Sequence, residues 1–269
     1  MTILISIIYY MNIVEKAYAK INLSLVVLDK RDDGFHNIDS IIVPINLYDT
    51  LYFYENENSI SLRSNVNIPN NIVLKAAFLI KEKYNVNCGV LIKLIKNIPI
   101  GAGLGGESAD ASATIRGLNK LWDLNLSVDE MESIALSLGS DTLFCLYNRP
   151  SIVRGRGDIL IPFDYPEENI ILYVPKLKLN TKNMFLSFDE DTNRLNSPDE
   201  KLGFNSFLSY ALDKYSELNE IYCALKDHYL KVYFSGSGSA FFVFSNGEPL
   251  DIPLCQSLKT TIKSKLNNF

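Results

Sequence analysis

The pattern of apolar and polar residues predicts an antiparallel sheet in the first part of the chain. Residues 14–28 are mostly apolar, and residues 40–48 and 50–55 have the composition and spacing of two further strands. The sequence Asp-Asp-Gly at residues 32–34 is typical of the turn in a β-hairpin. One more short strand is expected in the polar connection of residues 56–71.

Two helices are predicted from their capping residues. Asn71 can cap the first, because the apolar positions after it step by four, three and four residues. Ser127 and Glu130 form a capping-box pattern at the start of the other, and Gly139 ends it where a left-handed residue is expected. The apolar face of the first helix consists of Val73, Ala77, Ile80 and Tyr84.

Residues 97–113, with the sequence NIPIGAGLGGESADASA, join a predicted strand at residues 89–96 to a third helix. Either Ser108 or Asp110 could cap that helix, whose apolar positions are Ala111, Ile115, Leu118 and Trp122. Four glycines within six residues let the turn adopt left-handed backbone angles and expose its N–H groups. A glycine turn that leads into a helix N-terminus is the arrangement that binds phosphate.

Three other interpretations of this turn are weaker. Its glycines match the dinucleotide pattern G-x-G-x-x-G, but no strand with an acidic end follows about 20 residues later. A P-loop needs Lys and then Ser or Thr after its last glycine, whereas this chain has Glu107 and Ser108. The further signatures of protein kinases are absent from the sequence. A tight turn whose glycines serve packing alone remains an alternative.

The second half of the chain predicts a separate domain. Residues 151–163 have the pattern of a hairpin, and we place a boundary after it, which gives domains of residues 1–163 and 164–269. The acidic run at residues 189–203 is the best candidate for a mobile loop, and a short C-terminal helix is expected at the end. The other expected elements are strands at residues 169–177, 230–234 and 240–245, a helical region at residues 204–225, and a small-residue turn at residues 235–239.

Composition limits the classes of function. A chain of 269 residues with 47% hydrophobic content can bury a full core, and its net charge of −5 argues against a nucleic-acid binder. Four separated cysteines and two histidines predict neither a zinc site nor a disulfide framework, so we expect reduced thiols and a cytoplasmic protein. Residues 1–10 are apolar but lack a basic segment and are too short to span a bilayer. We interpret them as an extension or a first strand, with no membrane partner.

Several polar features have more than one interpretation. Lys20 and Asn22 interrupt an apolar strand, so they either have buried partners or leave the Lys20 amine in water. Asp141 precedes an apolar run, where it could be tuned by partial burial or be an ordinary helix cap. A lone histidine such as His36 is more often structural than functional. The turn at residues 235–239 could hold an anion or simply close a hairpin.

Six segments, in order from Ala17 to Phe244, resemble the GHMP kinase superfamily: AYAKINLSL, RDDGFHNIDSIIVPINLYD, NNIVLKAA, IPIGAGLGGESADASATIRGLNKLW, LGSDTLFCL and YFSGSGSAFFVF. The first two are most similar to the kinases that phosphorylate a cytidine diphosphate sugar alcohol in the non-mevalonate isoprenoid route. The resemblance implies an α+β fold, in which a domain like ribosomal protein S5 domain 2 meets a ferredoxin-like domain. It also implies transfer of the γ-phosphoryl group of ATP, accompanied by Mg²⁺, to the 2-hydroxyl of a methylerythritol moiety.

The resemblance assigns roles residue by residue. Asp141 matches the catalytic aspartate that takes the proton of the attacking hydroxyl, and Lys20 matches the lysine beside it. ATP would contact Pro99, Ile100, Gly101, Ala102, Gly103, Leu104, Gly105, Gly106, Glu107, Ser108 and Ala109, with Asn71, Ile72 and Lys96 at the adenosine. The cytidylyl substrate would contact Asn22, Phe35, His36, Thr181, Phe185, Ser235, Gly236 and Ser237.

The chain departs from the family pattern at Glu107 and Ala109, and the metal ligands do not follow from the resemblance. A homoserine or mevalonate kinase is an alternative, against which the segment DDGFH argues. A nucleotide-binding protein without activity is another, against which the presence of both Lys20 and Asp141 argues. We expect small-molecule partners alone, and a monomer or a weak homodimer.

Overall fold

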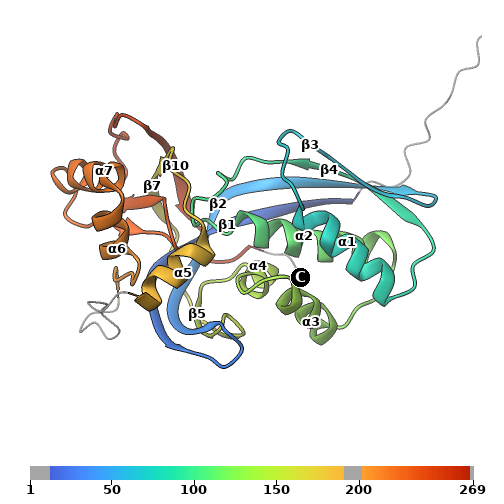
Figure 1. Ribbon diagram of the computed structural model, residues 1–269. Coiled ribbons are helices and arrows are strands. Elements are labelled where there is room, and N and C mark those ends of the chain that lie inside the picture. The colour runs from blue at the N-terminus through green and yellow to red at the C-terminus, as the bar shows by residue number, and fades with distance from the viewer. Residues whose placement is uncertain (1–12, 191–201, 267–269) are drawn as a thin grey trace, which may run out of the picture.

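The computed structural model describes residues 13–190 and 202–266, which form two lobes joined by two long strands (Figure 1). Helices α1 to α4 belong to one lobe and α5 to α7 to the other. The strands are β1 (Ile13–Lys30), β2 (His36–Asn56), β3 (Ile60–Ser64), β4 (Gly89–Ile95), β5 (Ser151–Gly155), β6 (Ile159–Pro162), β7 (Glu168–Pro175), β8 (Tyr233–Phe234), β9 (Phe241–Phe244) and β10 (Cys255–Ile262). The helices are α1 (Ile72–Lys83), α2 (Gly106–Leu121), α3 (Val128–Leu138), α4 (Thr142–Tyr147), α5 (Thr181–Glu190), α6 (Leu208–Lys214) and α7 (Ser216–Lys226).

The hairpin of β1 and β2 organises the sheet, as the sequence predicts. Its turn is closed by the Arg31 N–H, which donates to the Phe35 carbonyl at 2.8 Å, and Gly34 takes a φ of +84°. The two strands predicted at residues 40–48 and 50–55 are a single strand, which was not foreseen. Asp49 lies between them and continues the ladder, because its buried carboxylate accepts hydrogen bonds that offset the loss of hydration.

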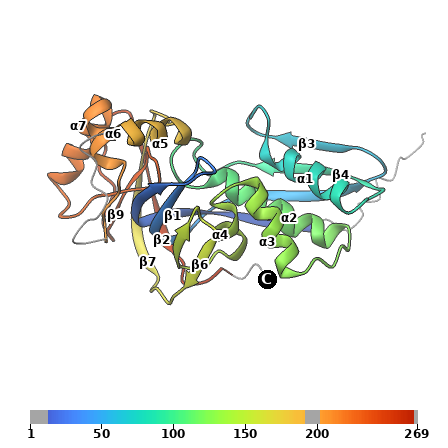
Figure 2. The ribbon, with the colours of Figure 1, turned by 60° about the horizontal axis from the view of Figure 1, so that its bottom comes forward.

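In the first lobe, α2 lies on β1 and β2, and α1, α3 and α4 pack around it (Figure 2). Asn71 caps α1 as predicted, because its side chain accepts from the Val73 N–H at 2.9 Å. The predicted cap of α2 is wrong. That helix begins earlier, after Gly105 at a φ of +70°, without a side-chain cap, because Ser108 lies within the first turn and Asp110 is committed to a buried ion pair.

The next helix, α3, begins as expected and ends differently. Both hydrogen bonds of the capping box between Ser127 and Glu130 are present. Gly139 follows the last helical residue, but its φ of 171° is extended rather than left-handed, so the chain leaves α3 straight toward Asp141. All four cysteines are unpaired, and no helix within the described ranges is long and apolar enough to cross a membrane.

The second lobe ends in a strand, so the expected C-terminal helix is wrong. Residues 255–262 form β10, which pairs with the whole of β7 and, through Ile262, with Ile45 of β2. The sheet therefore runs from β3 through β2 and β10 to β8 without a break. The domain boundary after residue 163 stays a prediction. Residues 189 and 190 of the acidic run end α5, while residues 191–201 and the N-terminal residues 1–12 lie outside the described part of the chain.

Candidate active site

The glycine-rich turn between β4 and α2 has every carbonyl from Gly101 to Gly105 engaged. Leu179, Ala240, Lys20 and Ala109 donate their backbone N–H groups to the carbonyls of residues 101, 102, 104 and 105. The Gly103 carbonyl accepts from the Ser235 hydroxyl at 3.0 Å. These contacts come from both lobes, so the turn is held in place by parts of the chain that are far apart in sequence.

The backbone N–H groups of the same turn, unlike its carbonyls, are available to a ligand. Among the described residues, none of the N–H groups from Gly101 to Ser108 donates to a protein acceptor. Gly101, Gly103 and Gly105 take φ angles of +69°, +75° and +70°, which turn successive amides away from the carbonyl side. Unpaired amides at the N-terminus of a 16-residue helix form an anion site. Packing alone does not explain this arrangement.

The small-residue turn at residues 235–239 packs directly on the glycine-rich turn. A Cβ atom on Gly103 would lie 2.1 Å from the Ser235 carbonyl oxygen, so only glycine fits. Thr181, at the start of α5, shares a 2.9 Å hydrogen bond with the Ser237 hydroxyl. The turn closes the hairpin of β8 and β9 and also forms one wall of the site.

Lys20 lies between these two turns and is buried, with 3% of its surface exposed. A Cβ on Gly105 would lie 2.9 Å from Lys20 Cγ, and one on Gly236 would lie 3.1 Å from Lys20 Nζ. Its Nζ donates to Asn22 Oδ1 at 2.7 Å and lies 3.4 Å from Asp141 Oδ2. Of the two interpretations of Lys20, the buried one is therefore confirmed.

One further side chain, that of Ser40, orients Asn22, and it was not foreseen. Asn22 Nδ2 donates to Ser40 Oγ at 2.8 Å, and Ser40 Oγ donates to the Ser24 carbonyl at 2.6 Å. Because Ser40 is fully buried, its hydroxyl has a fixed direction. The chain of hydrogen bonds therefore fixes the Asn22 oxygen toward Lys20. Ser40 sits at the start of a predicted strand and gave no signal in the sequence.

Asp141 occupies the N-cap position of α4, yet its side chain makes no capping hydrogen bond. One third of the side chain is exposed, whereas Lys20 is almost wholly covered. The ammonium is therefore held by the protein, and the carboxylate reaches solvent beside it. Such a carboxylate can accept a proton from a ligand hydroxyl.

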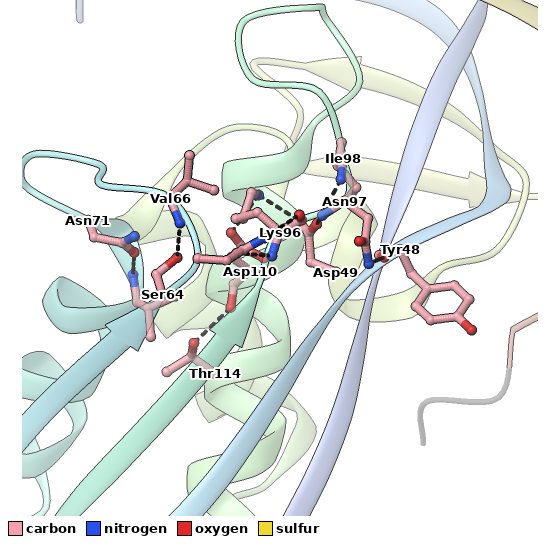
Figure 3. Close-up of polar contacts among 12 residues, drawn as sticks. Tyr48, Asp49, Ser64, Val66, Asn71, Lys96, Asn97, Ile98, Asp110 and Thr114 are labelled. Carbon is pink, nitrogen blue, oxygen red and sulfur yellow. Dashed lines mark hydrogen bonds and ion pairs between the residues drawn. The ribbon is translucent and has the colours of Figure 1, made fainter. Parts of the chain in front are cut away.

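Beneath the glycine-rich turn lies a buried cluster of Lys96, Asp49 and Asp110 (Figure 3). Lys96 Nζ donates to Asp49 Oδ2 at 2.5 Å and to Asp110 Oδ2 at 2.8 Å. Asp49 Oδ1 also accepts the N–H groups of Asn97 at 2.5 Å and Ile98 at 2.8 Å. The cluster thus ties the entry of the turn to α2. The sequence analysis named Asp110 only as a possible helix cap and did not name Asp49, although an acidic residue inside an apolar strand could have indicated Asp49.

Burial raises the pKa of Asp110 to about 8, and the nearby charge of Asp49 adds to this while Lys96 opposes it. Asp110 Oδ1 has no hydrogen-bond partner among the described residues. Asp49 accepts three hydrogen bonds, from the Lys96 ammonium and from the N–H groups of Asn97 and Ile98. At neutral pH the raised pKa favours the protonated form of Asp110 in the folded protein.

The predicted adenosine residues lie near a groove of about 870 Å³ beside α1. Asn71 lines it, and Ile72 is the first residue of α1. The Lys96 ammonium is turned into the buried cluster, so it is not available to a ligand in the groove. Asn65 bonds the Lys96 backbone at both its N–H and its carbonyl, which was not foreseen.

Two of the predicted cytidylyl residues, His36 and Phe185, meet where the β1–β2 hairpin contacts α5. His36 is 7% exposed, and its ring stacks on Phe185 with 5.1 Å between centroids. Its Nε2 lies 2.6 Å from Asp189 Oδ1, a contact that the sequence did not indicate. Phe35 is 48% exposed, and its ring lies 5.3 Å from the guanidinium carbon of Arg156.

The residues that could hold a divalent cation are few. Within the described ranges, no three side chains among His, Cys, Asp and Glu gather as a metal site would require. Asp141 is a partly exposed carboxylate, and Glu107 is an exposed one in the first turn of α2. This set fits a cation that takes most of its ligands from phosphate oxygens and water, as Mg²⁺ usually does.

Comparisons with known proteins agree on one family. Residues 71–149 match the GHMP kinases N terminal domain. A 4-diphosphocytidyl-2-C-methyl-D-erythritol kinase of Clostridioides difficile is 36% identical over 260 residues, which cover 87% of each chain. A kinase of the same name from a Thermoanaerobacter species is 44% identical over 177 residues, which span 65% of this chain and 61% of that relative.

A solved structure is also similar over nearly the whole chain. It is a crystal structure of 4-(cytidine 5'-diphospho)-2C-methyl-D-erythritol kinase, with a TM-score of 0.80 and 27% identity. The alignment covers 93% of this chain and 99% of that one.

Proposed function

Because the chain belongs to the 4-diphosphocytidyl-2-C-methyl-D-erythritol kinases of the GHMP kinase superfamily, we propose that it catalyses the reaction for which they are named. It would transfer the γ-phosphoryl group of ATP to the 2-hydroxyl of the methylerythritol moiety, a step of the non-mevalonate isoprenoid pathway. The fold supports this placement, since the α+β GHMP kinase fold expected from the sequence is confirmed.

One observation carries the proposal. Lys20 Nζ and Asp141 Oδ2 lie 3.4 Å apart, and Lys20 packs against Gly105 of the turn whose amides are unpaired. An acceptor hydroxyl beside Asp141 would therefore lie close to a phosphate bound by those amides. Phosphoryl transfer needs such alignment and charge neutralisation more than covalent participation by the protein.

In this assignment the side chains of Asp141 and Lys20 have different roles. Asp141 accepts the proton of the 2-hydroxyl as its oxygen attacks phosphorus. Lys20, held by Asn22 at 2.7 Å, offsets the negative charge of the transferring group. The turn amides and the N-terminus of α2 hold the phosphates in line.

ATP is the co-substrate of the kinase family, and Mg²⁺ is part of the proposal. When bound, the ion would neutralise phosphate charge. Asp141 and Ser108, which lies in the first turn of α2, are the protein groups that we propose to lie nearest this ion. Glu107 is exposed and adds a carboxylate that the family pattern lacks.

The remaining assignments follow the same geometry. Adenosine would lie near Asn71 and Ile72, in the groove beside α1. The cytidylyl group would lie near Phe35, His36 and Phe185, where rings can stack on a base and a histidine can bond its edge. Thr181, Ser235, Gly236 and Ser237 would face the part of the substrate nearest Lys20.

The test is release of ADP from ATP with three acceptors: the cytidylyl substrate, homoserine and mevalonate. Turnover with the cytidylyl substrate alone supports the proposal. Turnover with either of the other alcohols would assign a different GHMP kinase activity. Nucleotide binding without any turnover would identify a silent member of the fold.

A further inference from the structure

The histidine at the tip of the β1–β2 hairpin is fixed by a carboxylate from the other lobe. Asp189 lies in the last turn of α5, and its Oδ1 is 2.6 Å from His36 Nε2. Lys30, the cross-strand partner of His36 in the hairpin, places its Nζ 2.5 Å from Asp189 Oδ2. Two neighbouring side chains of the hairpin thus bind the two oxygens of one carboxylate.

This contact determines which nitrogen of the His36 imidazole carries a proton. Burial alone would raise the pKa of Asp189, but the hydrogen bonds from Lys30 and His36 outweigh it and lower the pKa, so the group is a carboxylate at neutral pH. A carboxylate only accepts hydrogen bonds, which requires a proton on His36 Nε2. A neutral imidazole with its proton on Nε2 has an acceptor at Nδ1.

Nδ1 of His36 is left for a ligand. It has no hydrogen-bond partner in the part of the chain that the structure describes, although more than nine-tenths of the residue is buried. The half-buried ring of Phe185 stacks on the imidazole, and Phe188 meets its edge at 6.3 Å. An unpaired acceptor beside aromatic rings suits the edge of a flat polar ring.

The helix that carries Asp189 also reaches the reacting end of the site. Its first residue, Thr181, is bonded to Ser237 in the turn that packs on Lys20. Eight residues later comes Asp189, about 12 Å along the helix axis. A substrate that lies along α5 could therefore have its hydroxyl near Lys20 and its base near His36.

We propose that Asp189 is a positioning residue that keeps the proton of His36 on Nε2, and so presents Nδ1 as an acceptor to the exocyclic amino group of cytosine. Uracil has a carbonyl oxygen at that position, which would face the Nδ1 lone pair and be rejected. This inference rests on the proposed function. It explains how the proposed substrate site distinguishes a cytidylyl from a uridylyl substrate.

The Asp189→Asn variant makes a directional test. The Lys30 ammonium can only donate, so the amide oxygen of the new side chain faces Lys30 and its NH₂ group faces His36. Nε2 must then accept, which moves the imidazole proton to Nδ1. We expect the ratio of kcat/KM for the cytidylyl substrate to that for its uridylyl counterpart to fall at least tenfold, with the KM for ATP unchanged.

Two other variants separate this role from a structural one. Glu190→Ala removes the neighbouring acidic charge, which is exposed on the same helix, and is expected to leave the ratio within twofold. Asp189→Ala removes the carboxylate without offering a donor, so it should raise the KM of the cytidylyl substrate and reduce the ratio without reversing it. An equal loss with both substrates in all Asp189 variants would show that the contact is only structural.

The tautomer itself can be observed by ¹⁵N NMR of the imidazoles, since the chain has only two histidines and His228→Asn identifies the signals. We expect a proton on Nε2 of His36 in the wild type and on Nδ1 in Asp189→Asn. A wild-type proton on Nδ1, or on both nitrogens, overturns the inference. The inference is also overturned if the tautomer changes in Asp189→Asn while the ratio of kcat/KM for the two substrates stays the same.

Failure of the proposed function would remain distinguishable. If the wild type phosphorylates neither substrate, calorimetry with CDP and UDP still tests the base selection. Preference for CDP that is lost in Asp189→Asn supports the inference without the kinase activity. Equal binding of CDP and UDP by the wild type overturns it.

Discussion

Nζ of Lys20 lies 3.4 Å from Oδ2 of Asp141, although one residue comes from β1 and the other from the start of α4. The lysine is enclosed by Gly105 and Gly236, while the aspartate keeps a third of its side chain in solvent. In the proposed mechanism, the buried ammonium of Lys20 gives electrostatic support and the more open carboxylate of Asp141 accepts the proton.

Asp141→Asn is expected to lower kcat by about 10²–10⁴-fold, because the amide cannot accept the hydroxyl proton. ATP should still bind, which calorimetry would measure, since the turn amides are untouched. Asp164→Asn is the control, because that carboxylate is fully exposed. Activity in Asp141→Asn equal to that of the wild type would remove Asp141 from its role.

His36→Ala is expected to raise the KM of the cytidylyl substrate at least tenfold with little change for ATP, because the edge contact and the stacked ring are both lost. His228→Ala is the matched control, since this histidine is exposed and its ring shares a hydrogen bond with the Ala224 carbonyl, four residues earlier. Steady-state kinetics with each substrate varied in turn would measure both effects. A selective effect on ATP would reverse the assignment of the two ends of the site.

Gly103→Ala should separate the two packed turns. The new Cβ would lie 2.1 Å from the Ser235 carbonyl oxygen, at a backbone φ of +75°. We expect a raised KM for ATP and a loss of stability beyond the roughly 1–2 kcal/mol of left-handed strain alone.

Gly34→Ala is the control for that strain, because its φ is +84° and a Cβ there meets nothing within 4 Å. Thermal unfolding and ATP kinetics of both variants would be compared. Equal effects in the two would show that the contact with Ser235 is unimportant.

Asp110→Asn should change how stability depends on pH. Since the folded pKa of Asp110 is raised to about 8, the folded protein holds a proton that the unfolded chain releases above about pH 4. This group therefore stabilises the wild type most at low pH, and the contribution is lost as the pH rises through 8. The variant keeps a neutral side chain at both pH values. The difference in free energy of unfolding, variant minus wild type, should therefore be roughly 1–3 kcal/mol larger at pH 9 than at pH 5.

Urea unfolding at the two pH values would measure this difference. Thr142→Val, which removes a buried hydroxyl that does not titrate, is a control whose effect should be the same at both. If the Asp110→Asn and wild-type curves shift in parallel, Asp110 is ionised in the folded protein at both pH values.

The features that the sequence predicts well are those whose cause is local. The hairpin turn at residues 32–34, the Asn71 cap, and the Ser127–Glu130 box each depend on residues within a few positions of one another. The glycine-rich turn belongs to the same class, because its backbone angles follow from the residue type.

What the sequence could not predict depends on distant partners. Asp49 and Asp110 are recognisable as a cluster only once Lys96 lies between them, and Asp189 only once α5 lies on the hairpin. The capping role expected for Asp110 was wrong for this reason, since its carboxyl bonds Lys96 instead. Likewise β10 was mistaken for a helix, because its pairing with β7 and β2 is not visible in its own residues.

The carbonyls of the glycine-rich turn accept hydrogen bonds from Lys20, Leu179, Ser235 and Ala240, among others. The last of these residues to be synthesised, Ser235 and Ala240, come more than 120 residues after the turn. When a ribosome has made only the first lobe, it has synthesised the whole of the proposed phosphate-binding turn but fewer than half of the groups that hold its carbonyls in place. Competence to bind nucleotide should therefore arise late in synthesis, after β9 has emerged, rather than when the turn itself leaves the exit tunnel.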